Sequence, residues 1–205
     1  GGIDFLNQDP DKLLEMRLNF YLRGLNKIED PKAENELVGP NGEIVGRVKN
    51  GRPKFFPDYY VIPMSLDKDN DAQEAFNMID YFKRNGVLVK ELKEDTGPYK
   101  KGDLVIDMAQ AKRGYANHIL YKGSNEPAWA AMYAEVLVNF PDMRGFKSEP
   151  VFADGLFNGK LGEVTTTRAT RTSEIDPKAP YYVIANTSAS AVKAVNQAIA
   201  QGKSV

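Results

Sequence analysis

The sequence Tyr59-Tyr60-Val61-Ile62 recurs as Tyr181-Tyr182-Val183-Ile184, and the predicted fold follows from this repeat. In both places the four β-favouring residues follow a proline by a short step and lead through a polar loop into a helical pattern. Each helical pattern ends at a glycine, Gly86 or Gly202. After the second glycine the chain continues only to Val205. We therefore predict a duplicated strand–helix unit and expect the chain to be a fragment of a larger protein.

Strand and helix patterns alternate along most of the sequence, which is typical of an α/β protein. We predict a three-layer fold of the amidotransferase or flavodoxin kind, with a mostly parallel sheet and flanking helices. Strands are expected at 59–64, 87–92, 103–108 and 161–171, and helices at 71–86, 109–121 and from Pro127 through Leu137.

Two regions are expected in the chain. Residues 1–54 are predicted to form an N-terminal helix, opened by Asp9 and Pro10, and then an irregular connection from a preceding domain. Residues 55–205 are predicted to form the α/β domain, with the duplicated units at 55–92 and 179–205.

The composition excludes several classes of function. The 27 basic and 28 acidic residues nearly cancel, which argues against a nucleic-acid-binding protein. The chain has no cysteine, so disulfides, thiol catalysis and thiolate metal sites are excluded. No apolar run approaches the roughly 20 residues that a membrane-spanning helix needs, and no membrane span is predicted.

Residue types that carry catalysis are sparse. The one histidine, His118, lies in a predicted helix beside apolar residues and is not part of a zinc-binding motif. Asp103 and Asp107 flank a predicted strand and are interpreted as exposed strand ends and not as an acid/base pair. We predict no catalytic residue and no metal ligand in this chain.

The candidate ligand site is the carboxyl end of the repeated strands, where open α/β sheets bind ligands. Ser65 follows the first copy, and Thr187 and Ser188 follow the second at a helix start, where free amides can hold an anion. Alternatively, Thr187 or Ser188 simply caps its helix. Trp129 and the two tyrosine pairs form either a sugar- or peptide-binding platform or part of the core.

Several stretches resemble the region that follows the catalytic domain in bacterial zinc carboxypeptidases of the carboxypeptidase A-like class. They are residues 59–63 with the helix to Gly86-Val87, residues 101–110, residues 140–146, residues 191–199 with Gly202, and the lead-in at residues 20–26. The resemblance covers most of residues 15–205, and its motifs are fold-forming and not catalytic.

This resemblance implies a non-catalytic, amidotransferase-like accessory domain of an extracellular or cell-surface enzyme. The parent would hydrolyse C-terminal peptide bonds with a zinc ion held in a preceding catalytic domain of the same polypeptide, outside this chain. That catalytic domain is the expected partner, with a peptide or a cell-wall component as a further ligand. The alternative is a free-standing α/β module that binds a small ligand, a sugar or a peptide.

Overall fold

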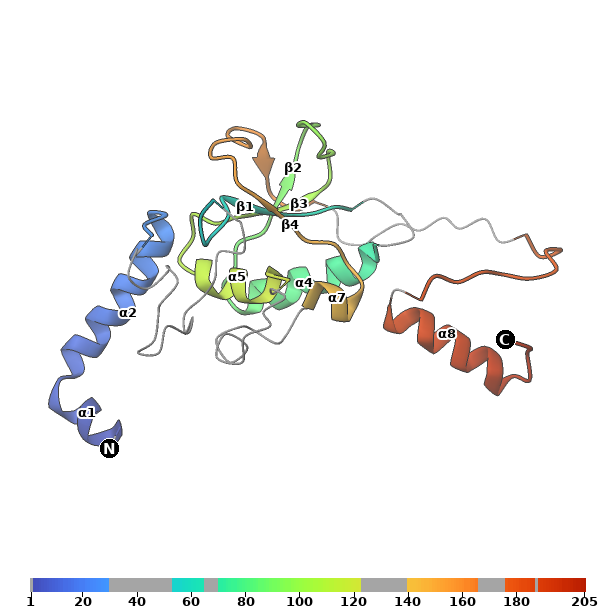
Figure 1. Cartoon of the computed structure of the whole chain (residues 1–205), viewed down its shortest axis with the longest axis horizontal. Helices are drawn as coiled ribbons and strands as arrows, with labels where there is room; N and C mark the ends of the chain where they lie inside the picture. The colour runs from blue at the N-terminus through green and yellow to red at the C-terminus, as the bar shows by residue number, and fades with distance from the viewer. Residues whose placement is uncertain (1, 30–52, 65–69, 123–139, 166–175, 187) are drawn as a thin grey trace, which may run out of the picture.

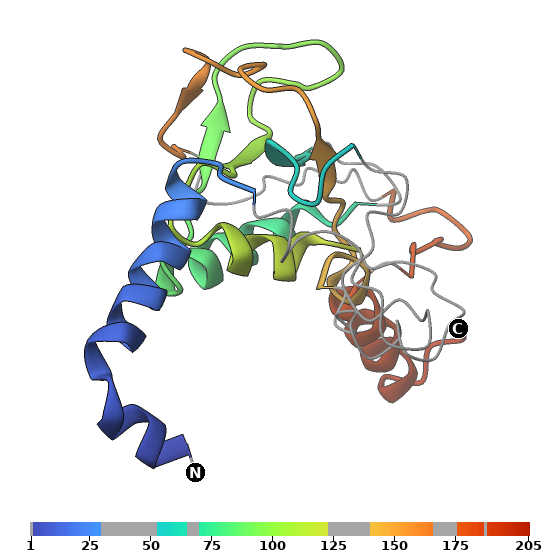
Figure 2. The same cartoon turned by 60° about the vertical axis from the view of Figure 1, so that its left-hand side comes forward.

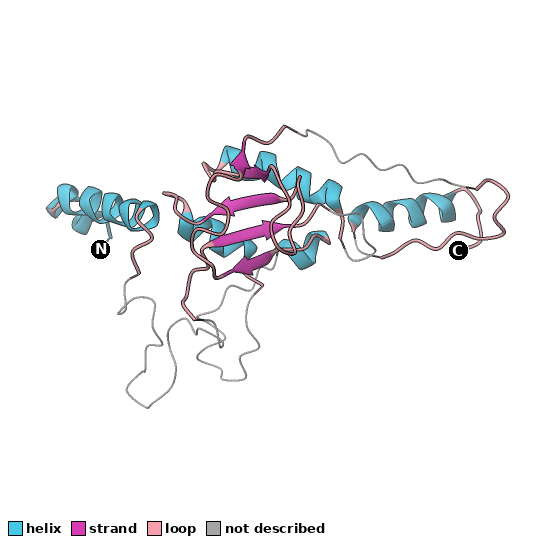
Figure 3. Cartoon of the chain, turned by 90° about the horizontal axis from the view of Figure 1, so that it is seen from above, coloured by secondary structure: helices cyan, strands magenta, loops and turns pink. Residues whose placement is uncertain are grey.

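The central sheet lies against helices on one side in the computed structural model, which describes residues 2–29, 53–64, 70–122, 140–165, 176–186 and 188–205 (Figure 1). Its strands are β1 (Tyr59–Ile62), β2 (Lys90–Leu92), β3 (Leu104–Asp107), β4 (Glu149–Val151) and β5 (Leu161–Gly162). They are arranged in the order β4-β1-β3-β2-β5, and every neighbouring pair is antiparallel (Figure 3).

The prediction of a mostly parallel sheet is therefore wrong. β1 and β2 do run in the same direction, because both are antiparallel to β3, and the helix α4 (Ala72–Arg84) joins them. However, β3 lies between them. It follows β2 through the loop 93–103, without a helix, and such a return connection makes the two strands antiparallel. Sequence alternation showed the crossover from β1 to β2 but not the strand inserted between them.

The helices cover only one face of the sheet in the described part of the chain, so the predicted third layer is absent there. On that face Tyr60, Ile62, Leu104 and Ile106 pack against α4 and α5 (Arg113–Leu120). On the other face Tyr59, Val61, Leu92 and Val105 are covered by loop residues such as Phe157 and Tyr99. All four residues of β1 are buried, which explains its continuous β-branched and aromatic sequence.

Local signals in the sequence place the helix α4 correctly. Asp71 is its N-cap, and its carboxylate accepts hydrogen bonds from the amides of Gln73 and Glu74. The helix ends before Gly86, which has a φ of 75°. Ala75, Met78, Ile79 and Phe82 form its buried stripe. The short helix α7 (Phe140–Arg144) follows further along the chain, beside α5.

The second copy of the repeat does not form a strand. Residues 181–184 pair with none of the described strands, although the helix α8 (Ala189–Ala200) forms after them as predicted. The equivalent position in the sheet is already occupied by β1, between β3 and β4. The described edge strands are also poor pairing partners for residues 181–184, since β5 has only two residues and β4 contains Pro150.

The other helices in the described part of the chain are α1 (Gly2–Gln8) and α2 (Pro10–Leu25). The predicted N-cap is confirmed, because the Asp9 side chain accepts a hydrogen bond of 3.0 Å from the Lys12 amide. The predicted helix from Pro127 through Leu137, which includes Trp129, lies outside the described residues, as does most of the predicted strand 161–171.

Candidate interaction surface

The helix α2 is held to the rest of the molecule by its C-terminal end. Gly24 is its buried residue, and a Cβ atom added there would collide with the backbone carbonyl oxygen of Gln110. It would also meet the carbonyl oxygen of Ala111 at 3.3 Å. A glycine at this position thus permits the last turn of α2 to lie directly against the chain that enters α5.

Charged groups also hold the C-terminal end of α2 to the rest of the molecule. Lys27, just after α2, forms an ion pair of 2.6 Å with Asp154 and lies 3.6 Å from the buried Asp58. Burial lowers the pKa of Lys27, but the hydrogen bond to Asp154 together with the negative charges of Asp107 and Asp154 outweighs this effect, so the pKa is raised. The same hydrogen bond lowers the pKa of Asp154. Arg113 adds a hydrogen bond of 2.5 Å to the carbonyl oxygen of Ile28.

Beyond this attachment α2 extends away from the sheet (Figure 2). Its apolar side chains are exposed. The side chains that share this exposure are Leu13, Leu14, Met16, Leu18, Phe20, Leu22 and Leu25. Leu14 and Leu18 are 66% and 58% exposed. A helix that is apolar on several sides is normally buried, so the exposed sides of α2 are suited to a further contact.

A groove of about 770 Å³ lies between α2 and α5. Its lining consists of Leu13, Leu14, Met16, Arg17, Phe20 and Tyr21 on α2, together with Phe56, Lys112, Gly114, Tyr115 and His118. A Cβ atom at Gly114 would lie 2.8 Å from the tip of the Phe20 ring, so this glycine lets the two helices approach closely at the end of the groove.

The charged groups that line the groove, among the residues that the structure describes, are basic. The ammonium of Lys112 lies 5.1 Å from the centre of the Tyr21 ring and donates a hydrogen bond of 3.4 Å to its hydroxyl. Arg17 lies 5.5 Å from the same ring centre. The hydrogen bond from Lys112 and the charge of Arg17 lower the pKa of Tyr21. The groove therefore favours an apolar partner that carries negative charge.

Tyr115, which lines the groove on the α5 side, belongs to a series of stacked aromatic rings that extends to α4 and α7. Tyr115 donates a hydrogen bond of 2.7 Å to the hydroxyl of Tyr81 on α4, and the two rings stack. Tyr81 in turn stacks on Phe140 of α7. Burial, with the hydrogen bond to Tyr81, raises the pKa of Tyr115 to about 12. Tyr115 thus remains protonated and fixed in place near neutral pH.

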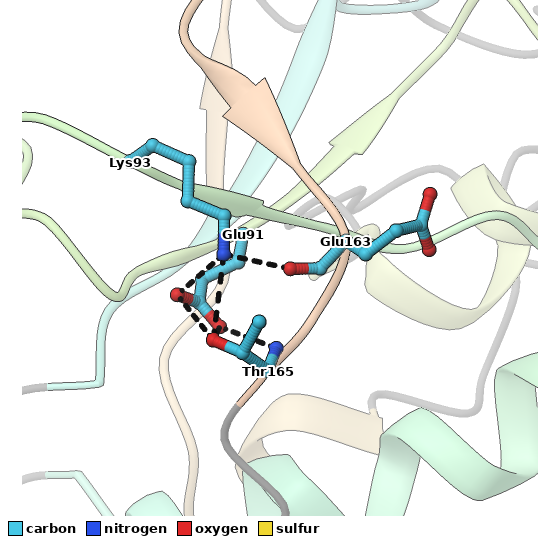
Figure 4. Close-up of polar contacts among 4 residues, drawn as sticks. All are labelled: Glu91, Lys93, Glu163 and Thr165. Carbon is cyan, nitrogen blue, oxygen red and sulfur yellow. Dashed lines mark hydrogen bonds and ion pairs between the residues drawn. The ribbon is translucent and has the colours of Figure 1, made fainter.

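A polar cluster lies at the β2–β5 edge of the sheet, apart from the groove (Figure 4). The buried Glu91 accepts hydrogen bonds from the Thr165 amide at 2.9 Å and from the ammonium of Lys93 at 2.9 Å. Lys93 also donates to the carbonyl oxygen of Glu163 at 2.7 Å. Because these groups satisfy one another, the cluster ties the segment after β5 to the sheet, and we interpret it as structural.

The predicted ligand site is described only in part. Ser65 and Thr187 lie outside the described residues. Ser188 is the N-cap of α8, and its hydroxyl accepts a hydrogen bond of 3.3 Å from the Ala191 amide, which is the capping role considered as the alternative. The argument for a ligand crevice assumed parallel strands whose carboxyl ends share an edge, and the antiparallel sheet removes that argument.

Of the two aspartates that were expected to be exposed strand ends, Asp103 is buried, so that expectation is wrong for it. It accepts hydrogen bonds from the Met64 and Lys100 amides, and Asp107 accepts one from the Ala109 amide. His118 lines the groove. The apolar residues of α2 could be recognised in the sequence. The contact between α2 and α5 that forms the groove could not, because it joins residues about 90 positions apart.

Within the described ranges there is no group of three or more histidine, aspartate or glutamate side chains that could hold a metal ion. The described helices include none that is both long and apolar enough to cross a bilayer. No family model, curated protein or solved structure matches this chain.

Proposed function

We propose that this chain is a non-catalytic accessory domain of a secreted zinc metallocarboxypeptidase-like protein. In this proposal the zinc ion and the hydrolysis of C-terminal peptide bonds belong to a catalytic domain of the same polypeptide. The present chain packs against that domain and helps to shape its substrate cleft or to hold a peptide or cell-wall ligand. The resemblance of residues 15–205 to the region after such catalytic domains is the reason for naming this partner.

The observation that carries an accessory role is the contrast between the two copies of Tyr-Tyr-Val-Ile. In β1 these residues are 2%, 1%, 0% and 1% exposed, whereas at 181–184 the same residues are 76%, 56%, 89% and 52% exposed. A sequence that forms a buried inner strand in one place has the β-propensity and apolar surface to do so in the other. The second copy is therefore suited to receive a contact from another domain.

A test joins the chain to a zinc carboxypeptidase catalytic domain through its N-terminus and compares it with the chain alone. We expect the amides of residues 181–184 to exchange hydrogen quickly in the isolated chain and more slowly in the joined protein. The isolated chain should bind no stoichiometric zinc and cleave no peptide. Zinc binding together with peptide cleavage by the 205-residue chain alone would contradict the proposal.

The alternative is a module that binds a small ligand, a sugar or a peptide. The groove between α2 and α5 favours it, because ligand sites commonly have volumes of roughly 300–1,000 Å³. A thermal-shift screen tests it, since a ligand at about 100 times its dissociation constant adds about 2.7 kcal/mol of stability. Loss of the shift in the Thr187→Ala, Ser188→Ala double variant would locate the ligand at α8, and loss in Arg17→Ala would locate it in the groove.

A further inference from the structure

A small cavity of about 280 Å³ lies beside β2 and the end of β3, apart from the groove between α2 and α5. Its lining consists of Leu88, Lys90, Asp107, Ala109, Gln110 and Leu161. Lys90 lies opposite Val105 in the β2–β3 ladder, and Asp107 follows two residues after Val105 on the same strand. Because side chains alternate along a strand, the ammonium and the carboxylate project from the same face of the sheet.

The two charged groups face the cavity without neutralising each other. Lys90 and Asp107 are diagonal neighbours across the two strands, a relationship that sets residues about 7–8 Å apart. The ammonium of Lys90 pairs with Glu163, whose side chain is 81% exposed. Among the described residues, the Asp107 carboxylate has no ion pair within 4 Å and accepts one hydrogen bond, of 2.8 Å, from the Ala109 amide. A carboxylate can accept about four hydrogen bonds, so Asp107 retains acceptor capacity.

The wall between these two groups is already formed. Gln110 is 2% exposed, and its side-chain amide donates to the carbonyl oxygens of Leu88 and Asp107 at 3.2 and 2.6 Å. Its Oε1 atom accepts a hydrogen bond of 2.9 Å from the Leu88 amide. These bonds join the chain before β2 to the loop after β3. The cavity therefore has a fixed shape, with apolar surface from Leu88, Ala109 and Leu161 around its two charges.

We propose that this cavity binds a free α-amino acid with an apolar side chain. Asp107 accepts hydrogen bonds from the ammonium of the ligand, Lys90 donates to its carboxylate, and Leu88 and Leu161 contact its side chain. The volume lies just below the range of roughly 300–1,000 Å³ typical of drug-sized ligands, which suits a smaller molecule. The inference goes beyond the proposed accessory role and does not depend on it.

The charges of the cavity select a ligand that carries both signs. A simple carboxylic acid would bring a negative charge beside Asp107, and a simple amine would bring a positive charge beside Lys90. The exposed pair between Lys90 and Glu163 contributes little to stability, so a ligand carboxylate can take the place of Glu163.

Titration of the 205-residue chain with L-leucine, followed by calorimetry, provides the test. Isocaproate lacks the ammonium of leucine, isoamylamine lacks the carboxylate, and glycine lacks the apolar side chain. We expect L-leucine to bind saturably and each of the three analogues to bind at least about tenfold more weakly, because each loses one of the three contacts. These measurements use the unaltered chain, so they do not depend on the folding of a variant.

Two variants then locate the site. Asp107→Asn keeps a side-chain oxygen that can accept from the Ala109 amide, and Lys90→Met keeps an apolar stem. Each should weaken L-leucine binding about tenfold with an unchanged circular dichroism spectrum. Glu163→Gln is the matched control. It removes the competing carboxylate and should bind L-leucine at least as tightly as the wild-type chain.

The proposal would be overturned if L-leucine, L-valine and L-phenylalanine all failed to bind saturably up to about 10 mM. It would also be overturned if isocaproate or isoamylamine bound as tightly as L-leucine, because the cavity would then not recognise both charges. Unchanged L-leucine affinity in both folded variants, or a clear loss of affinity in Glu163→Gln, would place the ligand elsewhere and overturn the proposal as well.

Discussion

Tyr60 on β1 and Asn117 on α5 are joined by a buried hydrogen bond, in which the tyrosine hydroxyl donates to the asparagine Oδ1 over 2.8 Å. This bond links the inner strand β1 to the helix that forms one wall of the groove. The equivalent residue of the second copy, Tyr182, donates instead to the carbonyl oxygen of Asp176 in an exposed position. The same residue type thus has a structural role in one copy and a solvent-exposed one in the other.

Tyr60→Phe is expected to lower the free energy of unfolding by about 1–3 kcal/mol, because the buried Asn117 side chain loses its hydrogen bond. The matched control is Tyr182→Phe, which removes an exposed hydroxyl and should change the stability little. Urea denaturation of both variants measures the difference. Equal effects of the two substitutions would show that Tyr182 is as well packed as Tyr60.

Gly24→Ala is expected to detach or displace the C-terminal end of α2, because the new methyl group meets rigid backbone carbonyl oxygens. The cost should be about 1–3 kcal/mol, as for other overpacked sites, and it exceeds the gain in helix propensity. Faster hydrogen exchange of the amides at residues 22–28 would report it.

Gly114→Ala is the control for that substitution. Its methyl group meets only the tip of the Phe20 ring, which is 47% exposed and can turn aside. Its destabilisation should therefore be smaller, since alanine also favours the helix by up to about 1 kcal/mol. If Gly114→Ala destabilised the protein more than Gly24→Ala, the close approach at Gly24 would not be what holds α2.

Glu91→Ala is expected to release the segment that follows β5. The carboxylate accepts hydrogen bonds from the Thr165 amide and from Lys93, and its removal should cost about 1.5–3 kcal/mol. Glu163→Ala is the control, because the Glu163 side chain is 81% exposed while its backbone carbonyl still binds Lys93. Stability measurements with hydrogen exchange at residues 163–165 should separate the two variants.

The Lys27–Asp154 pair is expected to make the attachment of α2 dependent on pH. The pKa of Asp154 is lowered in the folded chain, so its contribution is present above the unfolded value of about 3.9 and is lost as the pH falls through the folded value. The pKa of Lys27 is raised, so its contribution is complete below about 10.4 and is lost as the pH rises through the folded value.

Asp154→Asn checks this dependence. The variant should be less stable than the wild-type chain at neutral pH, and the difference should disappear toward pH 2, where the wild-type carboxylate is protonated as well. Because Asp154 is an exposed side chain, the effect should be small and should shrink at high salt. A difference that persisted unchanged at low pH would assign it to packing and not to charge.

The sequence alone was sufficient for features that depend on near neighbours. The cap at Asp9, the cap at Asp71 and the end of α4 at Gly86 each require only a few consecutive residues. The strand β1 was recognisable because four β-favouring residues stand together, and α8 because its cap and closing glycine flank a helical pattern. The same local patterns predicted a strand at residues 181–184, where they were insufficient.

Tertiary structure decided which strands pair and in which direction. β3 lies between β1 and β2, so a βαβ connection that is typical of parallel sheets became part of an antiparallel one. It also decided that one Tyr-Tyr-Val-Ile copy is buried and the other exposed, since β1 occupies the inner position between β3 and β4. Strand pairing and burial depend on partners far apart in the chain, and local residue preferences carry no information about those partners.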